Sequence, residues 1–185
     1  MNYEWIRDVL IQIGRQVCNR VHHSLIHQSL EDRTAVHAET AEDTIYNIDR
    51  DVESIILPLL EKDAGNLGGI ILVAEGIGDE SGLVIPDDAD PETVAWRLIM
   101  DPIDGTRGIM YDKRSAFFLA GAAPNRGKTT SLRDIDVSVM VELPTSRSHL
   151  SDEFWAIRGQ GVYRTTRNLS TGEYIPRSIT PSQSK

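Results

Sequence analysis

The chain has 185 residues, of which 40% are hydrophobic and 25% are charged. This length and composition suit a single globular domain. A net charge of −9 argues against nucleic-acid binding through a general basic surface. Cys18 is the only cysteine, so a disulfide framework or a thiolate metal site is excluded and a reducing compartment is expected. Residues 1–17 mix charged with apolar side chains and match neither a signal peptide nor a membrane span. We therefore expect a cytoplasmic protein without a membrane partner.

Two helices are predicted in the first third of the chain. Residues 3–30 place apolar side chains at helical spacing along one stripe. Residues 31–42 are polar and predict a loop. A second helix is predicted over residues 47–62, with a kink at Pro58, because an interior proline costs a helix about 3 kcal/mol.

After Gly65 the pattern changes to that of strands. Within residues 134–144, apolar side chains alternate from Ile135 onward, which predicts a strand with one buried face. Residues 81–92 predict turn and loop. The tail from Asn168 predicts an edge strand followed by disorder. The predicted strands are residues 68–75, 94–101, 115–123 and 134–144, with a hairpin over 153–164. The order predicts an α+β fold in which two helices pack on one face of a largely antiparallel sheet. We assign residues 1–167 to this domain and 168–185 to a tail or to the start of a missing C-terminal domain.

Carboxylates end two of the predicted strands. Glu75 closes one apolar run, Asp101 closes another, and Asp104 follows just beyond Pro102. If the two strands are neighbours, these carboxylates converge, and converging carboxylates repel one another unless cations lie between them. Mg²⁺ takes oxygen ligands and leaves room for water and phosphate oxygens. The three residues are therefore candidate metal ligands.

Gly105-Thr106 directly follows Asp104, the last of these carboxylates. The pair predicts a turn into a helix start, where free backbone N–H groups favour an anion. Carboxylates for a metal beside amides for a phosphate suit the hydrolysis of a phosphate ester. Asp-Pro and Asp-Gly are also ordinary turn signals, and composition and spacing alone favour a structural turn.

Residues 101–106, DPIDGT, follow an apolar strand with Trp96 and resemble the signature of the inositol monophosphatase-like family. These are Mg²⁺-dependent, lithium-sensitive phosphatases that include fructose-1,6-bisphosphatases and 3′(2′),5′-bisphosphate nucleotidases. Three further segments fall in the family's order. Residues 48–61 resemble its T-D-x-x-V-E helix, residues 73–80 its G-E-E segment, and residues 154–164 its strand-turn-strand. The resemblance runs from about residue 3 to about residue 165.

This resemblance implies the N-terminal half of a layered αβαβα sandwich and a site with two or three Mg²⁺ ions, for which Mn²⁺ can substitute. Glu75, Asp101 and the carbonyl of Ile103 would hold a first ion. Asp101 would bridge to a second ion that Asp104 also binds. Glu80 is the alternative to Glu75 as the match to the family's acidic pair, and Glu75 is preferred because it ends the strand.

The resemblance also implies roles in catalysis. The amides of Gly105 and Thr106 would hold the phosphate. Asp49 and the Thr106 hydroxyl would orient and deprotonate the attacking water. The implied partner is a small phosphorylated metabolite, which is an inositol, sugar or nucleotide phosphate.

Two departures from the family pattern shape these expectations. The family has a further aspartate in a W-D segment of a C-terminal domain, but none of the tryptophans here (Trp5, Trp96 and Trp155) is followed by Asp. We therefore expect a fragment of a longer enzyme. The alternatives are that a partner, such as a second copy in a homodimer, completes the site, or that the chain is a non-catalytic regulatory module.

The second departure lies just after the motif. The continuation of Thr106 is similar to the T-K-G-F of the bisphosphate nucleotidases, with Arg107 in place of Lys. Arg107, Lys113 and Arg114 would then face a second phosphate. The alternative, at equal weight, is that they are solvated turn residues.

Overall fold

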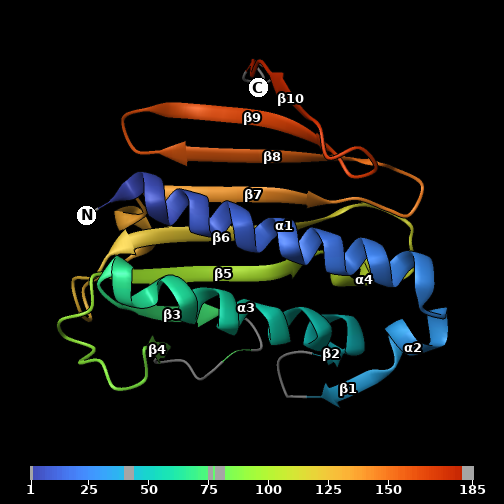
Figure 1. Ribbon diagram of the computed structural model, residues 1–185. Helices are drawn as coiled ribbons and strands as arrows, with labels where there is room; N and C mark the ends of the chain where they lie inside the picture. Colours follow the sequence, from blue (N-terminus) through green and yellow to red (C-terminus); the bar gives the residue numbers. More distant parts are fainter. Residues whose placement is uncertain (1, 40–43, 75–76, 78–81, 181–185) are drawn as a thin grey trace.

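The computed structural model describes residues 2–39, 44–74, 77 and 82–180. Helices α1 (Tyr3–His27) and α3 (Asn47–Leu67) lie side by side across one face of an eight-stranded sheet (Figure 1). The predicted α+β architecture, with two helices on a largely antiparallel sheet, is confirmed. No helix in the described part of the chain is both long and apolar enough to cross a membrane.

The sheet has the order β10-β9-β8-β7-β6-β5-β3-β4, and only β3 and β5 pair in parallel. In that pair Ala74 lies opposite Met100, so the carboxyl ends of the two strands meet at one edge. This meets the condition on which the predicted convergence of the carboxylates depends. The strands are β3 (Ile70–Ala74), β4 (Leu83–Ile85), β5 (Trp96–Asp104), β6 (Ala116–Pro124), β7 (Val137–Leu143), β8 (Leu150–Ile157), β9 (Gly161–Asn168) and β10 (Tyr174–Arg177).

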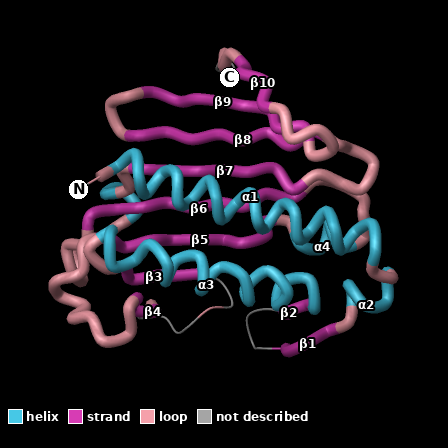
Figure 2. Tube along the Cα trace, in the orientation of Figure 1, coloured by secondary structure: helices cyan, strands magenta, loops and turns pink. Residues whose placement is uncertain are grey.

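Residues 31–39 are not the polar loop that was predicted, and residues 40–42 of that prediction lie outside the described residues. The first helix ends at His27 because Gln28 is extended, and Ser29 then caps the short helix α2 (Leu30–Thr34) by accepting from the amide of Asp32 at 3.1 Å. Strands β1 (Val36–Glu39) and β2 (Thr44–Tyr46) form a separate ribbon beside α2 (Figure 2).

Three other predictions were wrong in detail. Helix α3 continues through Pro58 to Leu67, where Gly68 at φ 83° ends it. Strand β4 lies within residues 81–92, which were predicted as turn and loop, and it pairs with β3. Ile135 precedes β7 and packs near Gly121 on the face of the sheet turned away from the helices, rather than with the valines of β7. The predicted edge strand after Asn168 is confirmed as β10, whereas residues 181–185 lie outside the described residues.

The core lies between the helices and the sheet. Gly14 of α1 lies so close to β6 and β7 that a Cβ there would come within 2.6 Å of Val141 and 2.7 Å of Phe118. At one end of α1, Tyr3 meets the buried ring of Trp96 edge to face, with the ring centroids 5.7 Å apart. The Tyr3–Trp96 contact holds the start of β5, and the candidate site lies at the other end of that strand.

Candidate functional site

The candidate site begins with an irregularity at the end of β5. Asp101 lies opposite Leu119 of β6 and Asp104 lies opposite Phe117, so the register shifts between them as in a β-bulge. The amide of Ile103 donates to Asp101 Oδ1 at 3.1 Å. The chain therefore bends where the two candidate metal ligands lie.

Gly105 allows the next bend. Its φ of 100° lies in the left-handed region that favours glycine, although a Cβ would meet only ordinary contacts, 3.5 Å from Ala116 Cβ. Helix α4 (Thr106–Met110) follows, and the amides of Gly108 and Ile109 donate to the Gly105 carbonyl. The predicted turn into a helix start at Gly105-Thr106 is confirmed.

The Thr106 hydroxyl joins this turn to a distant helix. Its Oγ1 lies 2.9 Å from the carbonyl oxygen of Ile103 and 3.0 Å from Asp49 Oδ1. A hydroxyl has one proton to donate, so these two acceptors share it. The structure thus brings together two of the residues predicted to act on the attacking water.

Asp49 lies in the first turn of α3. Its Oδ2 accepts from the amide of Tyr46 at 3.0 Å, which is a helix-capping interaction. The helix dipole also favours a carboxylate at this position. One carboxylate therefore caps α3 with one oxygen and contacts Thr106 with the other.

The remaining predicted residues differ in accessibility. Asp101 is half-buried, whereas Asp104 and Arg107 are exposed. Glu75 and its alternative Glu80 lie outside the described residues. Within the described ranges, no group of three or more His, Cys, Asp or Glu residues is placed to hold a metal ion.

The donor atoms at the turn nevertheless suit Mg²⁺. Asp101 and Asp104 offer carboxylate oxygens, and Ile103 offers a carbonyl oxygen that accepts from the Thr106 hydroxyl. These are the hard oxygen ligands that this ion prefers.

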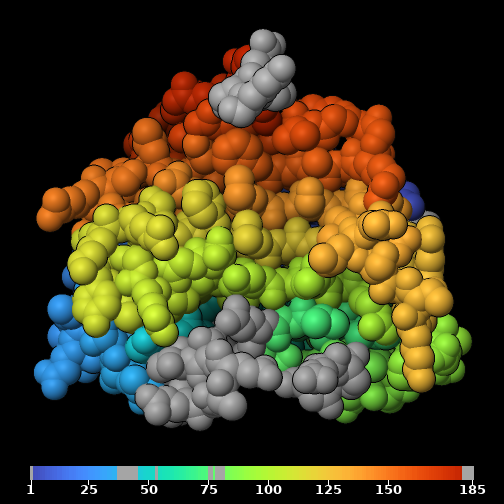
Figure 3. Space-filling model, turned by 180° about the vertical axis from the view of Figure 1, so that it is seen from behind, coloured from blue at the N-terminus to red at the C-terminus, as the bar shows by residue number. Residues whose placement is uncertain are grey.

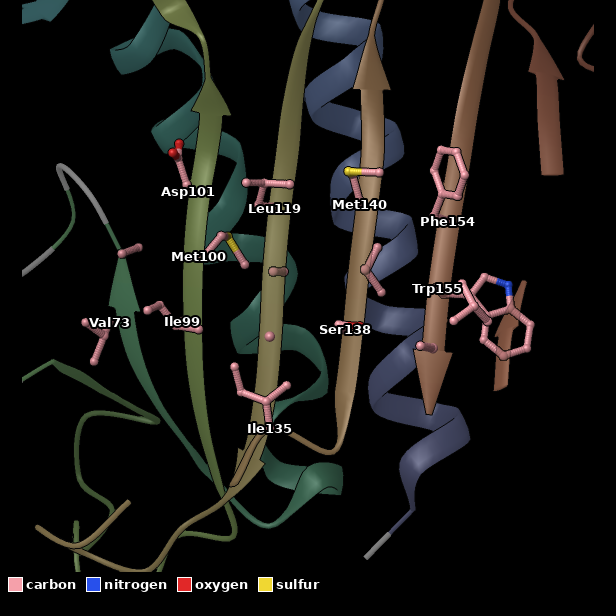
Figure 4. Close-up of a pocket in the computed structure, with 16 residues that line it drawn as sticks. Val73, Ile99, Met100, Asp101, Leu119, Ile135, Ser138, Met140, Phe154 and Trp155 are labelled. Atoms are coloured by element: carbon pink, nitrogen blue, oxygen red, sulfur yellow. The ribbon is translucent and has the colours of Figure 1, made fainter. Parts of the chain in front are cut away.

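Asp101 also borders a hollow on the face of the sheet opposite the helices, and Figure 3 shows the molecule from that side. The hollow has a volume of about 730 Å³. Figure 4 shows Asp101, Leu119, Met140 and Phe154 in a row across four successive strands. Ile99, also in its lining, is 42% exposed. The site therefore opens onto an apolar surface.

Two supporting contacts were not predicted from the sequence. Arg33 of α2 is buried and donates to the carbonyl of Met110, the last residue of α4. Asp112, just beyond α4, accepts from both the amide and the hydroxyl of Ser146. Both residues lie in polar stretches, and a single sequence has no signal that separates them from solvated side chains.

His22 of α1 lies near this support, with its ring centroid 6.3 Å from that of His149. Burial lowers the pKa of His22, and the charge of His149 lowers it further, against opposing effects of a Ser148 backbone hydrogen bond and of Asp112. Because the folded pKa lies below the unfolded value of about 6.5, folding favours the neutral ring, and that contribution is lost as the pH falls below about 6.5.

We predict that His22→Gln reduces the loss of stability on acidification. Urea denaturation at pH 7.5 and pH 5.5 should show a smaller decrease in the free energy of unfolding for this variant than for the wild type. His23→Gln, at an exposed position of the same helix, is the control. Identical decreases in the wild type and in His22→Gln would contradict the prediction.

No protein-family model matches this sequence, and no curated protein matches it. Solved structures do match in fold. The Leishmania major fructose-1,6-bisphosphatase in holo form aligns with a TM-score of 0.67 and 14% identity, over 91% of this chain and 52% of that one. Its apo form gives a TM-score of 0.61 and 12% identity, over 92% and 50%. The extragenic suppressor protein suhB from Bartonella henselae gives 0.60 and 20%, over 86% and 51%.

The chain thus has a partial inositol monophosphatase-like fold. It spans about half the length of the solved structures that it matches. At these identities the likeness concerns the fold, which is the fold expected from the DPIDGT motif and its flanking segments.

Proposed function

We propose that this chain carries the metal- and phosphate-binding part of a Mg²⁺-dependent phosphomonoesterase that hydrolyses a small phosphorylated metabolite. The observation that carries the proposal is the 3.0 Å contact between Thr106 and Asp49, which are 57 residues apart. A structural turn needs only local bonds, such as that from the Ile103 amide to Asp101. A hydroxyl held between a carbonyl and a carboxylate from another helix is suited to moving a proton.

The proposed roles of the residues follow from this geometry. A threonine hydroxyl is too weak a base to act alone, so Asp49 would accept the proton that a water passes to Thr106. The amides of Gly105 and Thr106, at the start of α4, would donate to the phosphate oxygens. Glu75, Asp101, Asp104 and the Ile103 carbonyl would hold Mg²⁺. When bound, such ions would lower the pKa of a water molecule and stabilise the charge of the leaving oxygen.

We predict that Asp101→Asn lowers Mg²⁺-dependent phosphate release by about 10³-fold or more, because it removes charge from both proposed ion positions. The midpoint of thermal unfolding should change little. Asp88→Asn, at an exposed position after β4, is the control and should behave as the wild type. Unchanged release by Asp101→Asn would overturn the proposed function.

A 3′(2′),5′-bisphosphate nucleotidase is the second candidate, and exposed Arg107 directly after Thr106 favours it. Assays with inositol monophosphate, fructose 1,6-bisphosphate and adenosine 3′,5′-bisphosphate would separate the substrate classes. A preference for adenosine 3′,5′-bisphosphate that Arg107→Met removes would support the nucleotidase. A preference that Arg107→Met leaves in place would exclude Arg107 as the contact for a second phosphate. Mg²⁺ binding without any release would mean that this chain carries only half of an active site.

We further propose that a second lobe, equivalent to the other half of the matched structures, covers the apolar hollow beside Asp101. The support is the apolar lining, in which Ile99 is exposed and Phe154 is half-buried, and the coverage of about half of each matched structure. Sedimentation of this chain alone should then show a monomer. A dimer that Phe154→Asp dissociates would assign the face to a second copy and contradict this proposal.

A further inference from the structure

Arg33 of α2 is a buried cation close to the candidate site. Only 7% of its surface is exposed. Burying a guanidinium is costly unless its donors are satisfied, so a buried arginine is held by specific partners. The identity of those partners indicates what the residue does.

The partners of Arg33 are backbone carbonyls at the ends of two helices. Nη1 lies 2.8 Å from the carbonyl oxygen of Gln28, 3.3 Å from that of Leu25 and 3.4 Å from that of Ser24, at the end of α1. Nε donates to the carbonyl of Met110, at the end of α4, over 3.2 Å. Helix carboxyl ends carry unpaired carbonyls and a partial negative charge, both of which suit a cation. One planar side chain thus ties α4 to α1.

The same short helix is also attached to the start of α3. The amide of Asn47 donates to the carbonyl of Ala35 at 3.1 Å, and its side chain donates to the carbonyl of Asp32 at 3.0 Å. Asn47 is the first residue of α3, and Asp49 follows in the same turn. The segment around Arg33 therefore contacts both the helix that carries Asp49 and the helix that begins with Thr106.

We propose that Arg33 is a positioning residue that sets the contact between Thr106 and Asp49. It fixes the carboxyl end of α4 relative to the first turn of α3, and α4 has only five residues through which to transmit a displacement. A lysine at this position keeps the charge, but its single nitrogen cannot replace the fork that reaches both helix ends. The consequence for phosphate binding rests on the proposed function, whereas the effect on α4 does not.

Two variants and a matched control test this inference. Arg33→Met removes the guanidinium, and Arg33→Lys keeps the charge and serves if the first variant does not fold. Arg167→Met is the control, because Arg167 is 8% exposed and ties β9 to Asn19 of α1. Hydrogen exchange of the α4 amides reports on the helix, and calorimetric titration with inorganic phosphate in Mg²⁺ reports on the site.

We expect both Arg33 variants to exchange the α4 amides faster and to bind phosphate about tenfold more weakly, since small displacements of positioning groups have large effects. Arg167→Met should lower stability without either change. Normal α4 exchange in a folded Arg33 variant, or equal acceleration in Arg167→Met, would overturn the inference. If the wild type binds no phosphate while the Arg33 variants still loosen α4, the proposed function fails and the positioning role stands.

Discussion

Asp49→Asn is expected to reduce the turnover of phosphate ester by about 10²- to 10⁴-fold, the range typical of a lost proton acceptor. Asparagine keeps an oxygen that can cap α3 at the Tyr46 amide. It cannot accept the proton that Thr106 passes on. We therefore expect the free energy of unfolding to fall by no more than about 1 kcal/mol. Steady-state kinetics and urea denaturation of the same samples measure both quantities.

A second capping aspartate provides the control. Asp134 accepts from the Ser131 amide at 2.9 Å in the same N3 arrangement, but it belongs to a short helical turn before β7. Asp134→Asn should show a similar small loss of stability and unchanged turnover. If Asp49→Asn behaved like Asp134→Asn, Asp49 would be a capping residue only.

Phe118→Ala is expected to destabilise the protein by about 3–5 kcal/mol, the largest stability effect that we predict. The Phe118 ring on β6 is fully buried. Helix α1 approaches it so closely that position 14 has room for glycine but not for a residue with a Cβ. The cavity cannot close readily because Gly14 has no side chain to fill it. Equilibrium denaturation in urea measures the loss.

Phe154→Ala is the matched control on the opposite face of the sheet. Its ring borders the apolar hollow and is only half-buried. The expected loss is below about 2 kcal/mol, because less apolar surface returns to water. Equal losses of unfolding free energy in the two variants would contradict a core that lies between the helices and the sheet.

The long periodic elements were predictable because their own side chains define the buried face. Helix α1 and strands β5, β6 and β7 follow from apolar patterns, and the β8–β9 hairpin follows from Gly159 and Gly161. That β3 and β5 are neighbours was only a condition in the sequence analysis, and the structure meets it. The bend at Gly105 was also predictable, because the dipeptide Asp-Gly favours a turn.

The short elements were not predictable because tertiary contacts decide them. Helix α2 has five residues and depends on Arg33 contacts with carbonyls of α1 and α4. Strand β4 exists because β3 offers an edge to pair with. Ile135 changes face because it precedes β7 rather than continuing its alternation. In each case the stretch of sequence is too short to determine its own structure, and contacts with neighbouring elements decide it.

The contact between Asp49 and Thr106 was predictable only in part. The family resemblance suggested that both residues act on one water, but residue spacing could not bring α3 to the turn after β5. The geometry now supports a shared role for the pair.

Mn²⁺ titration followed by electron paramagnetic resonance, with and without inorganic phosphate, tests the central claim most directly, because it needs only the part of the site that this chain carries. Binding is expected to be tighter in the presence of phosphate, since phosphate oxygens would add ligands to the bound ion and such a coupling is reciprocal. Asp101→Asn is expected to lose both the binding and the linkage. Equal Mn²⁺ affinity in the wild type and in Asp101→Asn, with no effect of phosphate in either, would contradict the assignment of this turn as a metal and phosphate site.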